Sequence, residues 1–102
     1  MTTRRFEWYE AKAAANLRKH RVDFMVAAQV FLDPLHVSRL DRFEGGEERW
    51  QTIGLAGGFL LLVVAHTVRD EDKDGQDVEI IRIISARRAD RTERRRYEND
   101  DG

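Results

Sequence analysis

Arginine supplies most of the side chains in this sequence that could bind or stabilise an anion. Fifteen of the 18 basic residues are arginine, whose planar guanidinium grips phosphate bidentately and stays charged at physiological pH. Arg82 lies inside an apolar strand pattern, and Arg69 lies at the end of another. Because burying a lone guanidinium is very costly, we expect both to meet an anion in a wet cleft, or to pair with Glu48 or Glu79 for structural reasons alone.

Three histidines are candidates for general acid or base chemistry near neutral pH. His20 closes a predicted helix, where the C-terminal end of the helix dipole favours the protonated imidazole. It could protonate a leaving oxygen beside the arginines, or it could simply cap the helix. His36 is expected in a surface strand and His66 in an apolar strand, where a histidine is more often structural than catalytic.

The densest basic segment runs over residues 85–97. On a helix, Arg87, Arg91 and Arg94 share one face, which could bind RNA or DNA phosphates. The same face could instead dock an acidic partner protein or only be solvated. A GC-rich genome would also favour arginine over lysine, but it would not explain this clustering, which the formal net charge of −1 conceals.

Acidic residues gather just before that segment, over residues 70–79, but their spacing does not predict a metal site. The string from Asp70 to Gly75 matches the start of a calcium loop. The match fails at the twelfth position, Ile81, where a bidentate glutamate is required. The three histidines also lack the spacing of metal ligands, and cysteine is absent. We expect no metal or cofactor and interpret residues 70–77 as a hairpin turn.

Hydrophobic periods predict the elements that position these side chains. The first helix carries one apolar stripe (Ala11, Ala14, Ala15 and Leu17) and one polar stripe (Lys12, Asn16 and Lys19). Asp23 is a good N-cap for a second helix, which Pro34 ends. The predicted elements are a strand over 5–8, helices over 9–20 and 23–33, strands over 36–41, 48–55, 59–69 and 78–85, and a helix over 89–98.

These elements predict one α+β domain over residues 1–102. Two N-terminal helices and one C-terminal helix should pack on a three- to five-stranded antiparallel sheet, and residues from about 98 to 102 should form a disordered acidic tail. The longest apolar run, residues 59–65, is far shorter than the roughly 20 residues that cross a bilayer. With no signal-peptide pattern and no cysteine, we expect a cytoplasmic protein that does not contact the membrane.

Several stretches of the sequence resemble the BrnT family of small bacterial ribonuclease toxins. They are FEWYEAK with Asn16, Lys19 and His20, then VFLDP, ERW, LVVAHTVR and IRIISARRA. The sequence departs from the family pattern at Tyr9 and Arg21, where an acidic residue and a glycine are usual, and in a longer turn over residues 70–77. The resemblance implies a RelE-like microbial ribonuclease fold and RNA cleavage that inhibits translation.

The same resemblance implies partners. A BrnA-like antitoxin with a ribbon-helix-helix DNA-binding end would neutralise the toxin, and the complex, possibly a dimer of toxin–antitoxin pairs, would repress its own promoter. Operator DNA would then be contacted only through the antitoxin.

Metal-free RNA cleavage needs a base for the 2′-hydroxyl, cations for the phosphorane and an acid for the departing 5′-oxygen. We assign Glu48 as base, His20 as acid, and Arg69, Arg82 and Arg87 as phosphate clamps. The residues expected to bind RNA around them are Lys19, Arg49, Arg88, Arg91 and Arg94. The alternative is a non-catalytic nucleic-acid-binding or regulatory interaction module that uses the same basic helix.

Overall fold

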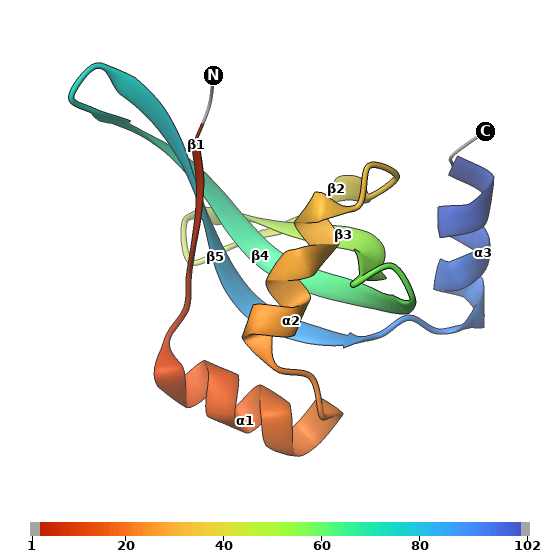
Figure 1. The fold of residues 1–102 in the computed structure, drawn as a ribbon. Coiled ribbons are helices and arrows are strands. Elements are labelled where there is room, and N and C mark those ends of the chain that lie inside the picture. The colour runs from red at the N-terminus through yellow and green to blue at the C-terminus, as the bar shows by residue number, and fades with distance from the viewer. Residues whose placement is uncertain (1–2, 101–102) are drawn as a thin grey trace.

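A five-stranded sheet in the order β1-β5-β4-β3-β2 forms the centre of the protein. The structure is a computed structural model that describes residues 3–100 (Figure 1). Its elements are β1 (Thr3–Glu7), α1 (Glu10–His20), α2 (Phe24–Ala28), the 3-10 helix η1 (Gln29–Leu32), β2 (Val37–Glu44), β3 (Glu47–Ala56), β4 (Leu60–Lys73), β5 (Gln76–Arg88) and α3 (Arg91–Asp100). The predicted α+β class is confirmed.

The sheet is mixed, so the expectation of a purely antiparallel sheet was wrong. Strands β2 to β5 form an antiparallel meander, whereas β1 pairs in parallel with β5, with Phe6 opposite Ile81. The chain leaves β1 through the helices and returns to its side only at β5. That long connection allows the two strands to run in the same direction, a relationship that local hydrophobic patterns do not encode.

The β4–β5 hairpin is longer than the sequence predicts. Its turn has only two residues, Asp74 and Gly75, both at positive φ (53° and 80°), as a tight hairpin turn requires. Most of the acidic stretch over residues 70–77 is therefore paired strand instead of loop. In the same way Gly45 and Gly46 alone turn the chain between β2 and β3, so residues 42–44 also belong to a strand.

Helix α1 buries the opposite side from the one that its apolar stripe suggested. Asn16 is only 5% exposed, whereas Leu17 and three alanines of the apolar stripe are exposed. The Asn16 amide donates to the carbonyls of Val22 (3.0 Å) and Ala86 (2.9 Å) and accepts from the Ala86 N–H (3.0 Å). Arg21 ends the helix at φ 61°, the left-handed conformation that a glycine would adopt without strain.

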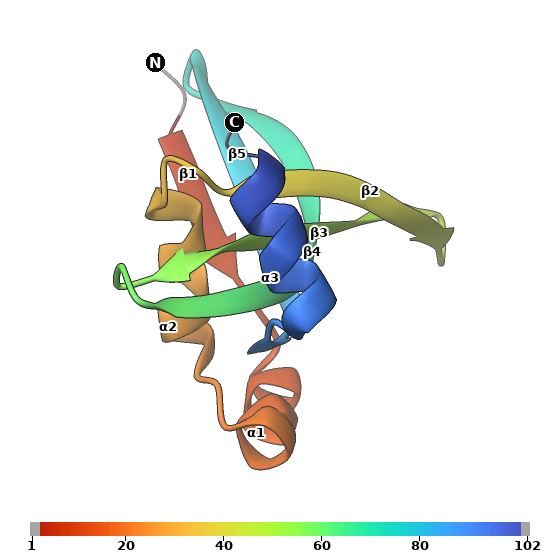
Figure 2. The ribbon, with the colours of Figure 1, turned by 90° about the vertical axis from the view of Figure 1, so that its right-hand side faces the viewer.

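The core lies on both faces of the sheet. On one face α2 and η1 cover Leu62, Val64, Ile81 and Ile83, and Asp23 caps α2 as predicted by accepting from the Met25 N–H. On the other face Tyr97 of α3 packs on β3 and β4 (Figure 2). Helix α3 covers only part of that second face, which leaves the area over β1 and β5 open.

Helix α3 continues to Asp100, so residues 98–100 are helical, contrary to the predicted disordered tail. Residues 101–102 lie outside the described residues. The helix begins with a reciprocal cap, because Glu93 accepts from the Asp90 N–H and Asp90 accepts from the Glu93 N–H (2.9 and 2.8 Å).

Candidate functional site

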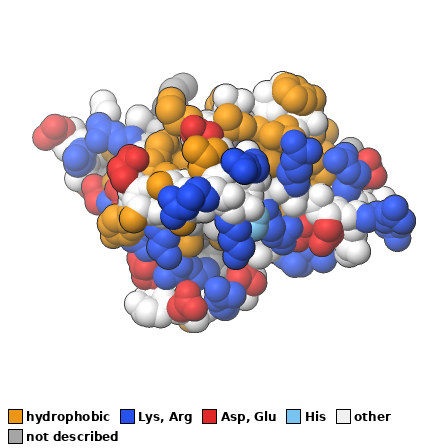
Figure 3. All heavy atoms as spheres, turned by 90° about the horizontal axis from the view of Figure 1, so that it is seen from below, with side chains coloured by type: hydrophobic (Ala, Val, Ile, Leu, Met, Phe, Trp, Pro, Cys, Tyr) orange, Lys and Arg blue, Asp and Glu red, His pale blue; other side chains and the backbone are white. Residues whose placement is uncertain are grey.

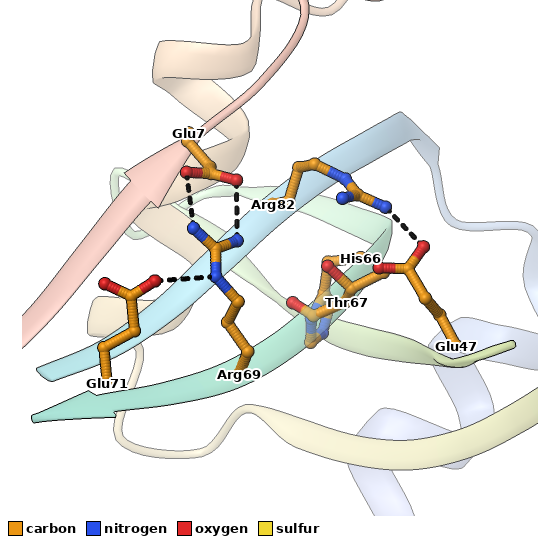
Figure 4. A network of polar contacts seen from close by, with 7 residues as sticks. All are labelled: Glu7, Glu47, His66, Thr67, Arg69, Glu71 and Arg82. Atoms are coloured by element: carbon orange, nitrogen blue, oxygen red, sulfur yellow. Dashed lines mark hydrogen bonds and ion pairs between the residues drawn. The ribbon is translucent and has the colours of Figure 1, made fainter.

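A row of polar side chains crosses the open face of the sheet. Glu7 of β1 lies opposite Arg82 of β5, and Arg82 lies opposite Thr67 of β4. Side chains alternate along a strand, so Arg69 of β4 shares this face with Thr67, while His66 points to the other face (Figure 4). The tertiary fold therefore brings Arg69 and Arg82 together on one accessible surface, as predicted.

Arg69 is held by two carboxylates. Its guanidinium donates to both oxygens of Glu7 (2.8 and 3.2 Å) and to Glu71 (3.1 Å). This contact lowers the pKa of Glu7 and raises the pKa of Arg69, chiefly through the hydrogen bonds between them. Both side chains remain more than 40% exposed. Exposed ion pairs add little stability, so an incoming anion can replace Glu7.

We call the side chains of Glu7, Thr67, Arg69 and Arg82 the arginine row. Arg82 is the more buried of its two cations. Its side chain is 17% exposed, it donates to Glu47 (2.7 Å), and its guanidinium lies 5.6 Å from the centre of the Tyr9 ring. The Arg82 hydrogen bond lowers the pKa of Glu47. Ring and carboxylate together hold the guanidinium in one orientation on the open face of the sheet.

Arg49 adds an unsatisfied donor near this pair. Its Nε is buried and has no hydrogen-bond partner within residues 3–100, and its terminal nitrogen is 3.9 Å from Glu47. A buried guanidinium nitrogen without a partner is costly. Another of its contacts is with Glu44, at 3.7 Å, and the predicted role of Arg49 in binding RNA stays a prediction.

His20 and Lys19 lie in a neighbouring pocket between α1 and β5. The pocket has a volume of about 240 Å³ and is lined by Lys12, Lys19, His20, Ser85 and the buried Asn16, among others. Lys and Arg side chains gather over this end of the molecule, with a histidine among them (Figure 3). Asn16 holds α1 to Ala86 and so fixes the distance between the two walls.

The arginine row and the His20 pocket are adjacent but separate. Ser85 lies three residues beyond Arg82 on β5, which corresponds to roughly 10 Å along the strand. His20 therefore does not contact Arg82, and the two sites form one elongated surface along β5. Such a surface matches an extended chain better than a small anion.

Glu48 does not join the arginines. Because Thr52 bonds to His66 on the helix-covered face, alternation along β3 places Trp50 and Glu48 on that face as well. Glu47 takes the opposite face and contacts Arg82 instead. The sequence could have identified Glu47 as the glutamate on this face, because Glu47 and Arg49 are two positions apart on a strand and must point to the same side. Glu7, Tyr9 and Lys12 were also missed, because nothing local ties them to β5.

Arg87 shares the face of Arg82 only because β5 contains a bulge. Ala65 pairs with Ser85 but His66 pairs with Ile83, so Ile84 is an extra residue. Arg87 is bound bidentately by Glu93 (2.8 and 2.7 Å), which lowers the pKa of that carboxyl. Since Glu93 also caps α3, the geometry gives Arg87 a structural role, and the structure does not bring it to the row.

The remaining predicted RNA-binding residues lie away from the row. Arg88 ends β5, and Arg91 and Arg94 lie on α3; all three are exposed. Within residues 3–100, no group of three or more His, Asp or Glu could hold a metal ion, and no helix is long and apolar enough to span a membrane. The predicted role of Arg88, Arg91 and Arg94 in binding RNA stays a prediction.

The structure is a small α+β domain that carries a row of carboxylate-paired arginines on the open face of its sheet. The pattern of a family described as "Ribonuclease toxin, BrnT, of type II toxin-antitoxin system" matches residues 8–93. The chain therefore belongs to the BrnT family of ribonuclease toxins, and membership implies an antitoxin partner. No curated protein matches the sequence.

A solved structure shares the fold. It is the crystal structure of the Brucella abortus ribonuclease toxin, BrnT, with a TM-score of 0.56 and 21% sequence identity. The match covers 87% of this chain and 99% of that chain. This similarity confirms the arrangement of helices on a five-stranded mixed sheet, and it carries no residue roles to this protein.

Proposed function

We propose that this toxin is an endoribonuclease that cleaves RNA without a metal ion, by attack of the 2′-hydroxyl on the adjacent phosphorus. The observation that carries the proposal is the pairing of Arg69 and Arg82 with carboxylates on the open face of the sheet. An RNA strand that runs along β5 from Arg82 to Ser85 places its scissile phosphate between the arginine row and His20.

In this mechanism the ion pairs exchange partners. The phosphate takes Arg82 from Glu47, and the freed carboxylate, whose pKa then returns toward its ordinary value, accepts the 2′-hydroxyl proton. The 2′-oxygen bonds to phosphorus, and Arg69 and Arg82 stabilise the charge of the phosphorane. The bond to the 5′-oxygen then breaks, and the His20 imidazolium protonates that oxygen, which leaves a cyclic 2′,3′-phosphate.

Further parts of the proposal follow from family membership. The fold groups with the RelE-like microbial ribonucleases, and cleavage inhibits translation in the cytoplasm. A BrnA-like antitoxin neutralises the toxin, and their complex, a dimer of toxin–antitoxin pairs, represses its own operon by contacting operator DNA through the antitoxin. The exposed arginines Arg88, Arg91 and Arg94 bind either RNA outside the scissile step or an acidic face of the antitoxin.

Cleavage of a labelled RNA in the presence of EDTA tests the central claim. We expect products that end in a cyclic 2′,3′-phosphate, and no cleavage of the same oligonucleotide with a single 2′-deoxy residue at the cut site. Products with a 3′-hydroxyl, or cleavage that EDTA abolishes, would contradict the 2′-hydroxyl mechanism. Retarded but intact RNA would instead support the non-catalytic binding module.

A further inference from the structure

A second pocket opens on the helix-covered face of the sheet, opposite the arginine row. Its volume is about 260 Å³, and its walls include Arg4, Phe31, His36, Ser38, Trp50 and His66. This volume would hold roughly nine water molecules, so it is close in size to adenine, which has ten heavy atoms. Because His66 and Thr67 point to opposite faces of β4, a ligand here cannot contact the cleavage site.

Aromatic rings form much of the wall. The Phe31 ring centre lies 5.0 Å from the His66 ring and 6.0 Å from the His36 ring. Trp50 is half-buried and shares this face of β3 with Thr52. Flat heteroaromatic rings stack on such side chains, and each stacked base typically contributes about 1–3 kcal/mol. The shape and lining therefore favour a planar ligand.

A chain of hydrogen bonds determines the polarity of the Ser38 hydroxyl. His66 Nδ1 lies 3.3 Å from the Thr67 carbonyl, which can only accept, so Nδ1 carries the proton. Burial lowers the pKa of His66 to about 4, so the ring is neutral at pH 7 and its Nε2 accepts. Thr52 must then donate to Nε2 (2.7 Å), and Ser38 must donate to Thr52 (2.7 Å).

This chain leaves the pocket with two hydrogen-bond acceptors. The Ser38 oxygen has given its only proton to Thr52, so its free lone pair can only accept. His36 Nδ1 lies 2.7 Å from the Asp33 carbonyl and must donate to it, so in the tautomer whose single ring proton lies on Nδ1 the Nε2 is the second acceptor. A ligand that satisfies both needs two N–H donors.

Arg4 places a positive charge at the rim of the pocket. It is paired with Glu79 (2.9 Å), its side chain is 40% exposed, and its guanidinium lies 5.7 Å from the centre of the Phe31 ring. An exposed ion pair of this kind can exchange its carboxylate for a phosphate group. The rim therefore suits the phosphate of a nucleotide whose base occupies the pocket.

We propose that this pocket binds an amino-bearing nucleobase, with adenine as the best fit, stacked on Trp50 and donating its amino hydrogens to Ser38 and His36. The base belongs either to a free nucleotide or to an RNA strand, since the chemistry is the same. The proposal does not rest on RNA cleavage, and its test measures binding alone.

Tryptophan fluorescence reports the pocket directly. The chain has two tryptophans, and Trp8 packs edge-on against Phe24, so Trp8→Phe leaves Trp50 as the reporter with a similar core. We expect AMP to quench Trp50 saturably. Purine riboside 5′-monophosphate, which differs only in lacking the amino group, should bind at least roughly tenfold more weakly. Equal affinity for the two, or no saturable quenching by AMP or by RNA, would overturn the proposal.

Two further arms complete the test. Ser38→Ala should reduce the AMP preference several-fold, because only the acceptor on His36 remains, whereas Thr92→Ala, which removes an exposed hydroxyl from α3, should leave it intact; equal effects of the two would refute the role of Ser38. A 2′-O-methyl oligoadenylate, which cannot be cleaved by 2′-hydroxyl attack, is titrated beside AMP. Binding of AMP identifies the free nucleotide as ligand, and binding of the oligonucleotide alone identifies a base within a strand.

Discussion

Replacing Asn16 by leucine should destabilise the protein by about 3 kcal/mol. Leucine is close to asparagine in size but cannot hydrogen-bond. The change leaves the Val22 carbonyl and both backbone groups of Ala86 without the side-chain partner that they have in the structure. Each lost buried hydrogen bond costs roughly 1 kcal/mol, and three are lost. In a domain of this size, that loss corresponds to a fall in Tm of roughly 12–24 °C.

Urea unfolding followed by circular dichroism measures this loss, and the chain offers a matched control. Its only other asparagine, Asn99, is exposed on α3, so Asn99→Leu makes the same chemical change where no buried partner is lost. We expect Asn99→Leu to change the free energy of unfolding by less than about 0.5 kcal/mol. A loss below about 1 kcal/mol for Asn16→Leu, or equal losses for both variants, would refute the reasoning.

Three further results are expected. Arg82→Ala should reduce kcat/KM for RNA cleavage roughly a hundredfold, whereas Arg18→Ala, which removes an exposed charge from the far side of α1, should change it little; similar losses would indicate only a general charge effect. Glu47→Gln should slow cleavage and Glu48→Gln should not, and the reverse outcome in the same assay would restore Glu48 as the base. The stability of the protein should fall as the pH falls from about 6.5 to about 4, because the unfolded chain takes up a proton that buried His66 does not. His66→Gln should flatten that part of a pH series of urea unfolding curves, and an unchanged slope would contradict it.

The arginine row shows how an anion site can exist in a chain with a formal net charge of −1. Arg69 is held by Glu7 and Glu71 and Arg82 by Glu47, so the charges of the row balance. Balance of this kind avoids the cost of unpaired guanidinium groups, and in the proposed mechanism it supplies a carboxylate beside each cation that would bind phosphate. The predicted structural pairing and the predicted phosphate binding are therefore compatible, although the partners are Glu7, Glu71 and Glu47 instead of Glu48 or Glu79, and Glu79 pairs with Arg4.

Local sequence signals predicted the elements well. Asp23 before an apolar helical face predicted the start of α2, where it accepts from the Met25 N–H. The β-branched run around Arg82 predicted a central strand. These signals work because caps, turns and alternating side chains depend on residues that are close in the sequence.

Local signals failed to predict burial and side-chain direction where these depend on residues far apart in the sequence. The polar stripe of α1 looked solvent-facing, but Asn16 is buried because a backbone segment 70 residues away needs its amide. The extra residue at Ile84, which changes the face of Arg87, is visible only against the register of β4.

The amino-acid sequence by itself determined the element types, the α+β class and the family, because these follow from local patterns and from motifs that span the chain. Only the tertiary structure decided which charges meet. It made β1 parallel to β5, placed Glu7 beside Arg69 and Glu47 beside Arg82, and kept His20 in its own pocket. The physical reason is that an ion pair depends on strand order and register, which are set by packing of the whole domain.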